Sequence, residues 1–453
     1  MRHRTDGSRP ATRRRTCAMV ARASALVLTL AGATIAGAQP VTTMGALRDT
    51  VVVSPEGPVR TIAAGVASAR PGGHVLVRAG SYSEPMIVVD RPITLEGEGW
   101  PLLDGEGKHE LIRIRANDVT VRGFRFTNVG VSMVEDRAAV RAVDVTGCAV
   151  TGNRFEDTFF GVYLQQVAGC ILADNVFAGV DRTGLEAYTG NAIHLWSSRD
   201  VEIVRNQISG HRDGIYFEFV RAAIVSDNVS EDNRRYGLHF MFSDSCRYEG
   251  NTFRHNGAGV AVMYTNTVTM IRNQFVDNRG SAAYGLLLKE IADPVLLDNR
   301  FVHNTVGIMA DGATRLVAER NVFADNGWAV KLLASVQDGL FRGNDFSGNT
   351  FTVGTNSGSG ASATFEGNWF DDYRGYDLDR DGKGDVPHRP VRLFSVLVAR
   401  YEPALVLQGS VFVRLLDAAE RALPSLTPRT LMDRGPAMRP VAGAGTLTAR
   451  SGS

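Results

Sequence analysis

The sequence contains little cysteine, little proline and no excess of either charge. Four cysteines, 16 prolines, and 49 Lys plus Arg against 48 Asp plus Glu are spread over 453 residues. Nucleic-acid-binding proteins usually carry an excess of positive charge, and this chain has almost none. A hydrophobic fraction of 44% with 21% charged residues argues against a disordered chain. We therefore expect a folded protein with a sizeable core and with no nucleic acid among its partners.

Long apolar runs are absent after the N-terminus, where residues 1–38 resemble an export signal. Seven arginines precede the apolar run Ala23 to Gly37, and Ala36-Gly37-Ala38 supplies small residues for cleavage. This pattern predicts a secretory signal peptide, and no later stretch is apolar enough to span a bilayer. Arg13-Arg14-Arg15-Thr16 leaves a twin-arginine signal open, but the residues after it match poorly, which favours the Sec route.

The cysteines that remain after removal of the signal are three in number: Cys148, Cys170 and Cys246. An odd count argues against a disulfide framework. Each lies five residues before an asparagine that belongs to a repeat. We expect Cys148 and Cys170, one repeat apart, to be small buried residues without a catalytic role.

The repeat is an asparagine that usually opens Asn-x-(Phe/Ile) and recurs in steps of mostly 22 to 24 residues. Only one member, Asn228, is followed by a different pattern. Six members have a second asparagine five residues later, followed by glycine and an alternating, strand-like segment. The members are Asn153, Asn175, Asn206, Asn228, Asn251, Asn273, Asn299, Asn321, Asn344 and Asn368.

A period of about 22 residues built from short strands predicts a right-handed parallel β-helix over residues 39–370. Asparagine suits the corners because it tolerates left-handed backbone angles and can bond to its equivalent in the next coil. The phenylalanines that follow should stack inside. A helix over Arg60–Arg70 should cap the first coil, and longer steps predict loops near Thr183–Asn191 and Arg279–Tyr284.

The repeat stops after Asn368, and three further segments follow. Residues 371–390 form an acidic, glycine-rich loop, and residues 391–440 form an extension with an amphipathic helix over Val411–Leu423. The final residues, 441–453, have a composition typical of a disordered tail.

Alternation along the strand-like segments predicts which side chains face outward. Two outward columns follow, one through His194, Tyr216, His239, Ala261, Leu287 and Met309, the other through Trp196, Glu218, Met241, Met263, Lys289 and Asp311. With coils about 4.8 Å apart, His239, Met241 and Met263 share one patch. Thioether and imidazole ligands suit copper(I), whereas a protein-docking surface is the alternative interpretation. Met309 is too distant to be a ligand and fits an interface better.

The acidic loop contains the alternating carboxylates Asp377, Asp379, Asp381 and Asp385 with a glycine at position 382. Four oxygen donors and a sharp turn are typical of a calcium loop, although His388 stands where a bidentate Glu is usual. A turn without metal is the alternative, and a calcium ion here would stabilise the fold.

Several stretches in order carry a family resemblance: Tyr236–Ser243, Gly259–Tyr264, Ala283–Lys289, Gly367–Asp377, Gly382–Pro390, Leu415–Pro424 and Asp433–Pro440. The chain resembles the NosD family of periplasmic accessory proteins. The resemblance implies a periplasmic β-helix that helps to assemble the copper-sulfide centre of nitrous-oxide reductase. It also implies four partners: the ATPase and membrane subunits of an ABC transporter, a membrane-anchored copper chaperone, and the apo reductase. His388 stands where the family pattern leads us to expect an aromatic.

Two other functions are compatible with a β-helix. A polysaccharide lyase, hydrolase or epimerase needs paired carboxylates or a proton-abstracting base on neighbouring coils, but Met241 and Met263 interrupt that column. A structural solenoid would carry uniform Ser, Thr and Asn columns, which this chain lacks. The sequence also has no phosphate-binding loop of the Gly-x-x-x-x-Gly-Lys-Ser/Thr kind, so any ATP hydrolysis must belong to a partner. We also expect that the chain itself is not an enzyme.

Overall fold

The structure is a computed structural model that describes residues 49–132, 134–180, 189–355, 362–423 and 431–442. The predicted signal peptide and residues 443–453 of the predicted tail lie outside these ranges, as does most of the predicted insertion near Thr183. None of the helices within the ranges combines the length and apolarity needed to cross a bilayer.

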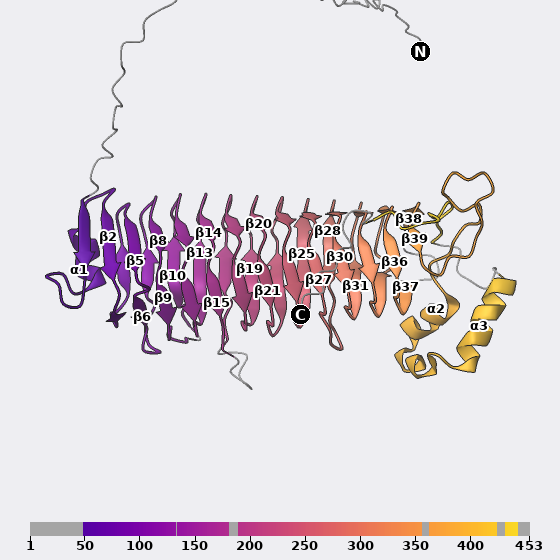
Figure 1. Cartoon of the computed structure of the whole chain (residues 1–453), viewed down its shortest axis with the longest axis horizontal. Coiled ribbons are helices and arrows are strands. Elements are labelled where there is room, and N and C mark those ends of the chain that lie inside the picture. The colour runs from indigo at the N-terminus through magenta and orange to yellow at the C-terminus, as the bar shows by residue number, and fades with distance from the viewer. Residues whose placement is uncertain (1–48, 133, 181–188, 356–361, 424–430, 443–453) are drawn as a thin grey trace, which may run out of the picture. The chain divides into compact units, whose positions relative to one another are not determined.

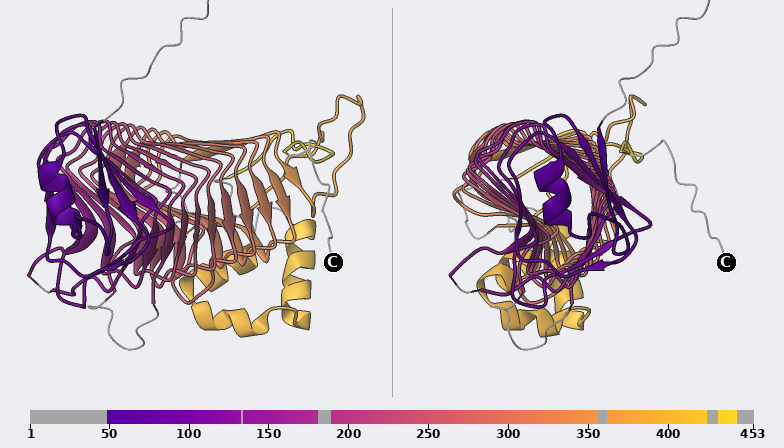
Figure 2. Two further views of the ribbon diagram at one scale, coloured as in Figure 1. Left: turned by 60° about the vertical axis from the view of Figure 1, so that its left-hand side comes forward. Right: turned by 90° about the vertical axis from the view of Figure 1, so that its left-hand side faces the viewer.

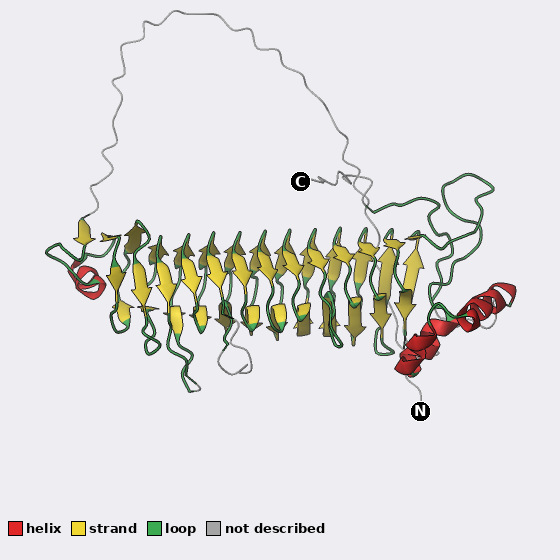
Figure 3. Cartoon of the chain, turned by 60° about the horizontal axis from the view of Figure 1, so that its bottom comes forward, coloured by secondary structure: helices red, strands yellow, loops and turns green. Residues whose placement is uncertain are grey.

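The described chain winds through three parallel sheets of 14, 12 and 13 strands, and each strand pairs in register with its equivalent in the next coil. Figure 1 shows the coils stacked in chain order, and Figure 3 shows the strands in rows with helices only beside them. The prediction of a parallel β-helix is confirmed.

The 14-stranded sheet contains β1 Thr50–Val53, β2 His74–Arg78, β5 Thr94–Glu98, β8 Thr120–Arg122, β11 Ala149–Thr151, β14 Ile171–Ala173, β17 Glu202–Val204, β20 Ile224–Ser226, β23 Arg247–Glu249, β26 Thr269–Ile271, β29 Val295–Leu297, β32 Val317–Glu319, β35 Gly339–Arg342 and β38 Ala363–Glu366. The 13-stranded sheet contains β3 Ser81–Tyr82, β6 Leu102–Asp104, β9 Arg125–Thr127, β12 Arg154–Glu156, β15 Val176–Ala178, β18 Gln207–Ser209, β21 Val229–Glu231, β24 Thr252–Arg254, β27 Gln274–Val276, β30 Arg300–Val302, β33 Val322–Ala324, β36 Asp345–Ser347 and β39 Trp369–Phe370.

The 12-stranded sheet carries the predicted outward columns. Its strands are β4 Ile87–Val89, β7 Ile112–Ile114, β10 Ala138–Val143, β13 Phe160–Gln165, β16 Ile193–Trp196, β19 Asp213–Glu218, β22 Tyr236–Met241, β25 Ala258–Asn266, β28 Leu286–Ala292, β31 Val306–Asp311, β34 Trp328–Leu332 and β37 Phe351–Gly354.

A ladder of buried asparagines joins the coils from Asn153 to Asn368. Each Oδ1 accepts both the backbone N–H and the Nδ2 of the preceding rung, as at Asn206, where the distances from Asn175 are 3.1 and 3.0 Å. The same Nδ2 group donates to a backbone carbonyl, for example from Asn175 to Val150 at 2.8 Å. Because every polar atom is paired, burying these amides costs little free energy, and each rung fixes its coil against the next.

The predicted hydrogen bonds between equivalent asparagines are therefore confirmed, but the left-handed angle predicted for them is wrong. The residue before each rung adopts the positive φ instead, as Asp174 (57°) and Arg205 (54°) do before Asn175 and Asn206. The asparagine side chain can then point inward and reach the next coil.

The interior beside the ladder contains stacked phenylalanines, as predicted. Phe275 and Phe301 have ring centroids 4.6 Å apart, and Phe301 and Phe323 follow at 4.9 Å. A second ladder of asparagines runs from Asn233 through Asn256, Asn278 and Asn304 to Asn326 and Asn349. From the coil of Asn251 to that of Asn344, the apolar stack and the two polar ladders recur together, which explains why the sequence period persists there.

Cys148 and Cys170 form a disulfide between adjacent coils, with Cα atoms 4.5 Å apart. The expectation that they are unlinked small residues is therefore wrong, although both are buried. In-register stacking brings equivalent positions of neighbouring coils within reach of a disulfide, which the odd count of cysteines does not reveal. Cys246 is free and buried in the described part of the chain.

Both ends of the coil stack are covered by chain from outside the repeat. The short helix α1 (Ile62–Ser68) lies across the first coils and buries Ile62 and Val66. Figure 2 shows this helix over the end of the stack. Its first N–H groups donate to the carboxylate of Glu84, at 2.6 Å from Ile62. The predicted capping helix is thus present.

The last asparagine rung is closed by Asp433 from the C-terminal segment. Its fully buried carboxylate accepts the backbone N–H and the Nδ2 of Asn368, both at 2.9 Å. Farther along, Val441 and Ala442, which fall in the range predicted to be disordered, donate backbone N–H groups to Asp345 at 2.8 and 3.0 Å. A carboxylate only accepts hydrogen bonds, so it suits the end of a ladder whose rungs donate in one direction.

Three helical segments form the extension: α2 (Leu393–Arg400), the 3-10 helix η2 (Glu402–Leu407) and α3 (Val411–Ala422). Phe394 and Val398 of α2 pack against Trp328 and Phe351 of the 12-stranded sheet. Met309 packs on the same cluster, so it contacts the extension of its own chain, whereas the sequence predicted an interface with another protein. Helix α3 lies where the amphipathic pattern predicted it.

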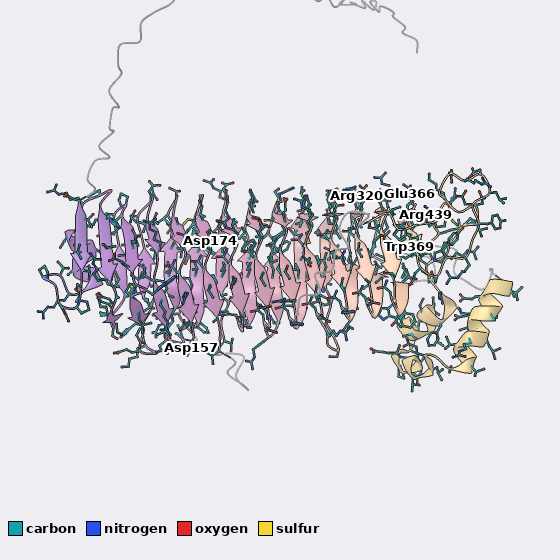
Figure 4. The ribbon with its side chains drawn as sticks, in the orientation of Figure 1. Asp157, Asp174, Arg320, Glu366, Trp369 and Arg439 are labelled. Carbon is teal, nitrogen blue, oxygen red and sulfur yellow. A yellow bond between two sulfur atoms is a disulfide. The ribbon has the colours of Figure 1, made fainter. Side chains whose placement is uncertain are left out.

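Arginine–carboxylate pairs join successive coils at the surface. Arg205 contacts Asp174 at 2.7 Å, and Arg320 contacts Asp298 at 2.8 Å. Figure 4 labels Asp174 and Arg320, which lie on different parts of the coil stack. Exposed pairs of this kind contribute little to stability, so the buried ladders set the register.

Replacing Asp433 with alanine should destabilise the coil stack. The variant leaves the N–H groups of Asn368 buried without an acceptor, at a cost of about 1–3 kcal/mol for each group. Asp433→Asn keeps one acceptor oxygen and should cost less. Urea denaturation of the mature protein checks the order wild type, Asp433→Asn, Asp433→Ala. Equal midpoints for the wild type and Asp433→Ala would show that the cap is dispensable.

Candidate metal centre

The two outward columns lie where alternation predicted them. One runs in register through Tyr216, His239, Ala261, Leu287 and Met309, and the other through Glu218, Met241, Met263, Lys289 and Asp311. Met241 of β22 and Met263 of β25 are direct partners, and both are half-buried. Their Cβ atoms are therefore about one strand spacing apart, roughly 4.8 Å. We call these two residues the methionine pair.

His239 lies on the same outer face as the methionine pair but is covered. Only 7% of its surface is exposed, and the rings of Tyr216 and Tyr236 contact it with centroids 5.2 and 4.6 Å away. The column continues away from the methionines as a stack in which His194 lies between Tyr163 (4.5 Å) and Tyr216 (4.7 Å). Alternation predicts the direction of a side chain, but it does not predict that neighbouring rings cover it.

The protonation state of His239 follows from its surroundings. Burial lowers its pKa to about 4, an effect that the positive charges of Arg235 and Arg212 reinforce and the negative charge of Asp213 opposes. Its Nδ1 lies 3.4 Å from Nη2 of Arg235, which binds the buried Asp213 through two hydrogen bonds of 2.9 and 2.7 Å. The ring is therefore neutral near pH 7, as a metal ligand must be.

The tautomer of His239 limits how it can bind a metal. Arg235 can only donate, so Nδ1 accepts and the proton is on Nε2. That Nε2 atom is buried and lacks a hydrogen-bond partner among the described residues. Ligation through Nε2 requires the proton to move to Nδ1, at the expense of the contact with Arg235. The methionine pair fits a soft cation as it stands, whereas His239 fits only after this change.

An exposed row of aromatic rings directly follows the methionine column. Phe219, Phe242 and Tyr264 come one residue after Glu218, Met241 and Met263, and they are 49%, 41% and 42% exposed. Their rings stack on one another with centroids 5.3 Å apart in both contacts. We call these three residues the aromatic ridge.

The backbone of the aromatic ridge is unusual. All three residues have positive φ angles, 56°, 50° and 55°, which bulky side chains seldom adopt. The ridge was not among the sequence predictions, although its spacing of 23 and 22 residues follows the coil period. The ridge places a contiguous apolar surface beside the methionine pair, in keeping with the alternative interpretation of this face as a docking surface.

His211 is a second buried histidine, at the end of the second asparagine ladder. Its backbone N–H donates to Oδ1 of Asn233 at 3.1 Å, as an asparagine would from that position. Both ring nitrogens are buried without a hydrogen-bond partner in the described ranges, and burial lowers the pKa to about 4. His194 behaves similarly, since burial lowers its pKa to about 3.

These depressed pKa values predict a loss of stability in mild acid. The unfolded chain binds protons on these histidines below pH 6.5, whereas the folded chain does not until about pH 4, so stability falls as the pH drops between these values. The loss at pH 4 should be about 3 kcal/mol for each histidine. His211→Asn restores the ladder residue and should flatten the decline, measured by urea denaturation at pH 7, 5.5 and 4.5. An unchanged slope would contradict the assignment.

The acidic loop brings three of its four predicted ligands together. Carboxylate oxygens of Asp377, Asp379 and Asp381 lie within 4.8 Å of one another. Asp385 is absent from this group and accepts the backbone N–H of Leu378 at 2.7 Å instead. Asp381 also accepts from Lys383 N at 2.8 Å, so its carboxylate holds a turn of the loop.

Calcium binding by this loop stays a prediction, and the geometry sharpens it. Asp379→Asn should weaken calcium binding roughly tenfold by removing charge from the cluster, while Asp385→Asn should have a smaller effect. Isothermal titration of the mature protein with calcium measures both variants. No calcium binding by the wild type would leave the loop as a turn without metal.

Comparison with known proteins agrees with this architecture. A family model described as "Periplasmic copper-binding protein (NosD)" matches residues 179–375. The "Probable ABC transporter binding protein NosD" of Pseudomonas aeruginosa is 30% identical over 384 residues, covering 81% of this chain and 88% of the relative. Its namesake from Stutzerimonas stutzeri is 25% identical over 380 residues, covering 80% and 86%.

Solved structures resemble the chain in fold. The Dettilon tailspike protein has a TM-score of 0.50 at 12% identity and covers 68% of this chain and 69% of its own. Fold and sheet faces together define the class: a parallel β-helix that displays a different column of side chains on each outer face. Within that class, the chain belongs to the NosD family.

Proposed function

We propose that this protein is a periplasmic accessory protein that accepts copper(I) and helps to mature the copper-sulfide centre of nitrous-oxide reductase. The observation that carries the proposal is the methionine pair, Met241 opposite Met263 on the outer face of adjacent strands. Two thioethers one strand spacing apart can bind a cuprous ion, and they stay usable in an oxidising compartment where a thiolate is at risk. Copper here is cargo to be passed on.

The surroundings of the methionine pair support transfer to or from a partner. The aromatic ridge beside it offers exposed apolar surface for a copper chaperone or for the apo reductase. His239, neutral and buried next to Met241, can add a third ligand if its proton moves to Nδ1. A site with two or three soft ligands at the edge of a docking surface suits release as well as capture.

Partnership with an ABC transporter is supported by the helical extension. Val406, Val411, Phe412 and Leu415 are 86%, 70%, 51% and 65% exposed on η2 and α3. Several strongly exposed apolar side chains on neighbouring helical segments are typical of an interaction site. The relatives are named as transporter-binding proteins, and we propose that this extension contacts the membrane subunits.

Location and chemistry are consistent with the proposal. The disulfide between Cys148 and Cys170 suits the periplasm, where disulfides persist. The outward column reads Glu218, Met241, Met263, Lys289, Asp311, so two methionines separate Glu218 from Lys289, while Lys289 and Asp311 are direct partners. We propose that the protein is not a catalyst, because the methionine pair interrupts the charged residues of this column.

A copper(I) competition titration under anaerobic conditions tests the site. Met241→Ala with Met263→Ala should weaken copper(I) binding at least roughly tenfold, because both soft ligands are lost. Met309→Ala is the matched control, since Met309 lies in the neighbouring column but packs on the C-terminal helices. His239→Ala alone should have a smaller effect.

The same variants test the maturation role in cells. Cells that carry the double methionine variant should produce nitrous-oxide reductase with reduced copper content, whereas the Met309 control should not. Equal copper binding by wild type and double variant would refute the ligand assignment. Weakened binding with normally loaded reductase would separate copper binding from maturation and refute the latter.

A further inference from the structure

A column of alternating aspartate and histidine side chains follows the strands of the 13-stranded sheet, outside the proposed copper(I) site, which lies on the 12-stranded sheet. Its members occupy one position in five successive coils, directly after β21, β24, β27, β30 and β33. They are Asp232, His255, Asp277, His303 and Asp325. Glycines at the equivalent positions 210 and 348 end the column on both sides.

The backbone fixes the spacing of this column. Every member has a positive φ between 53° and 57°, and its N–H donates to the carbonyl of the following coil, as from His255 to Val276 at 3.2 Å. Consecutive members are therefore one coil apart, about 4.8 Å. His255, the member of the column in this coil, lies just before the start of β25. Met263 and the aromatic-ridge residue of the same coil lie toward the other end of that strand.

The side chains approach one another without hydrogen bonding. Nitrogens of His255 lie 3.8 Å from Asp232 and 3.9 Å from Asp277, and nitrogens of His303 lie 3.6 Å from Asp277 and 3.7 Å from Asp325. These separations exceed those of hydrogen bonds. They are close to the roughly 3.3 Å that separates two ligand atoms held about 2 Å from one metal ion.

We infer that this column binds a borderline divalent cation, with Asp277 at the centre and His255 and His303 on either side. Imidazole with carboxylate suits copper(II) and zinc, and copper(II) should bind more tightly. A shared ion requires both histidine side chains to rotate toward Asp277, because these ligand atoms do not all lie within 4.8 Å of one another as those of the Asp377 group do. Such rotation is open to His255 and His303, which are 54% and 45% exposed. Asp232 and Asp325 add negative charge at the two ends.

One neighbouring group opposes the binding of a cation. Nε of Arg279 lies 3.7 Å from Asp277 and is held by the carbonyl of His303 at 2.7 Å. Its positive charge competes with a metal for the central carboxylate. Arg279→Gln should therefore tighten metal binding, which is the reverse of what loss of an ordinary surface residue would do.

The alternative explanation is that histidine merely separates aspartates that would otherwise repel one another. The test uses His255→Asn with His303→Asn, because asparagine accepts the same left-handed backbone and also separates the carboxylates. A purely structural role predicts that this double variant changes nothing beyond thermal stability. A metal site predicts that it loses the metal.

The experiment titrates copper(II) into the mature protein in excess calcium, followed by electron paramagnetic resonance, with zinc as competitor. The wild type should show nitrogen ligation, and the double histidine variant and Asp277→Asn should bind at least roughly tenfold more weakly. The Met241→Ala, Met263→Ala variant should bind copper(II) like the wild type, which separates this inference from the copper(I) proposal. Equal copper(II) affinity in the wild type and the histidine variant, or no nitrogen ligation, overturns it.

Discussion

The hydrogen bond between the amide of one asparagine and the amide of its equivalent in the next coil is the interaction on which this structure depends. A buried amide is costly unless all of its donors and acceptors are paired. In this chain the pairing is supplied by an identical side chain one coil away, as from Asn273 to Asn299 at 3.1 Å. Register, coil length and the direction of stacking all follow from that requirement.

A fixed register turns each outward position into a column of side chains at a constant spacing. The chain uses three such columns: thioethers at the methionine pair and rings along the aromatic ridge at the 12-stranded sheet, and alternating carboxylates and imidazoles directly after strands of the 13-stranded sheet. Thioethers are thereby kept apart from imidazoles and carboxylates on one rigid frame. The core does not change to accommodate them, because each column needs only a substitution at one outward position per coil.

The features that recur at the coil period could be predicted from the sequence, whereas contacts that occur once could not. The period from Asn153 to Asn368 predicted the fold, the stacked phenylalanines and both outward columns, because each depends on spacing alone. The disulfide at Cys148, the covering of His239 by neighbouring rings and the closure of the ladder by Asp433 depend on contacts between specific side chains. The column of aspartate and histidine lies four residues after ladder asparagines, but because two residue types alternate in it, no single residue type repeats at the coil period.

The asparagine ladder also has a direction, and that direction sets the order in which the buried amides can be paired as the chain folds. Each rung donates toward the coil that is made after it, so an early coil must wait for the next before its amide is paired. The last donor waits longest, since Asp433 follows Asn368 by 65 residues. A chain that enters its compartment N-terminus first therefore winds nearly all of its coils before it can close them. The C-terminal segment thus completes the hydrogen bonding of the whole stack.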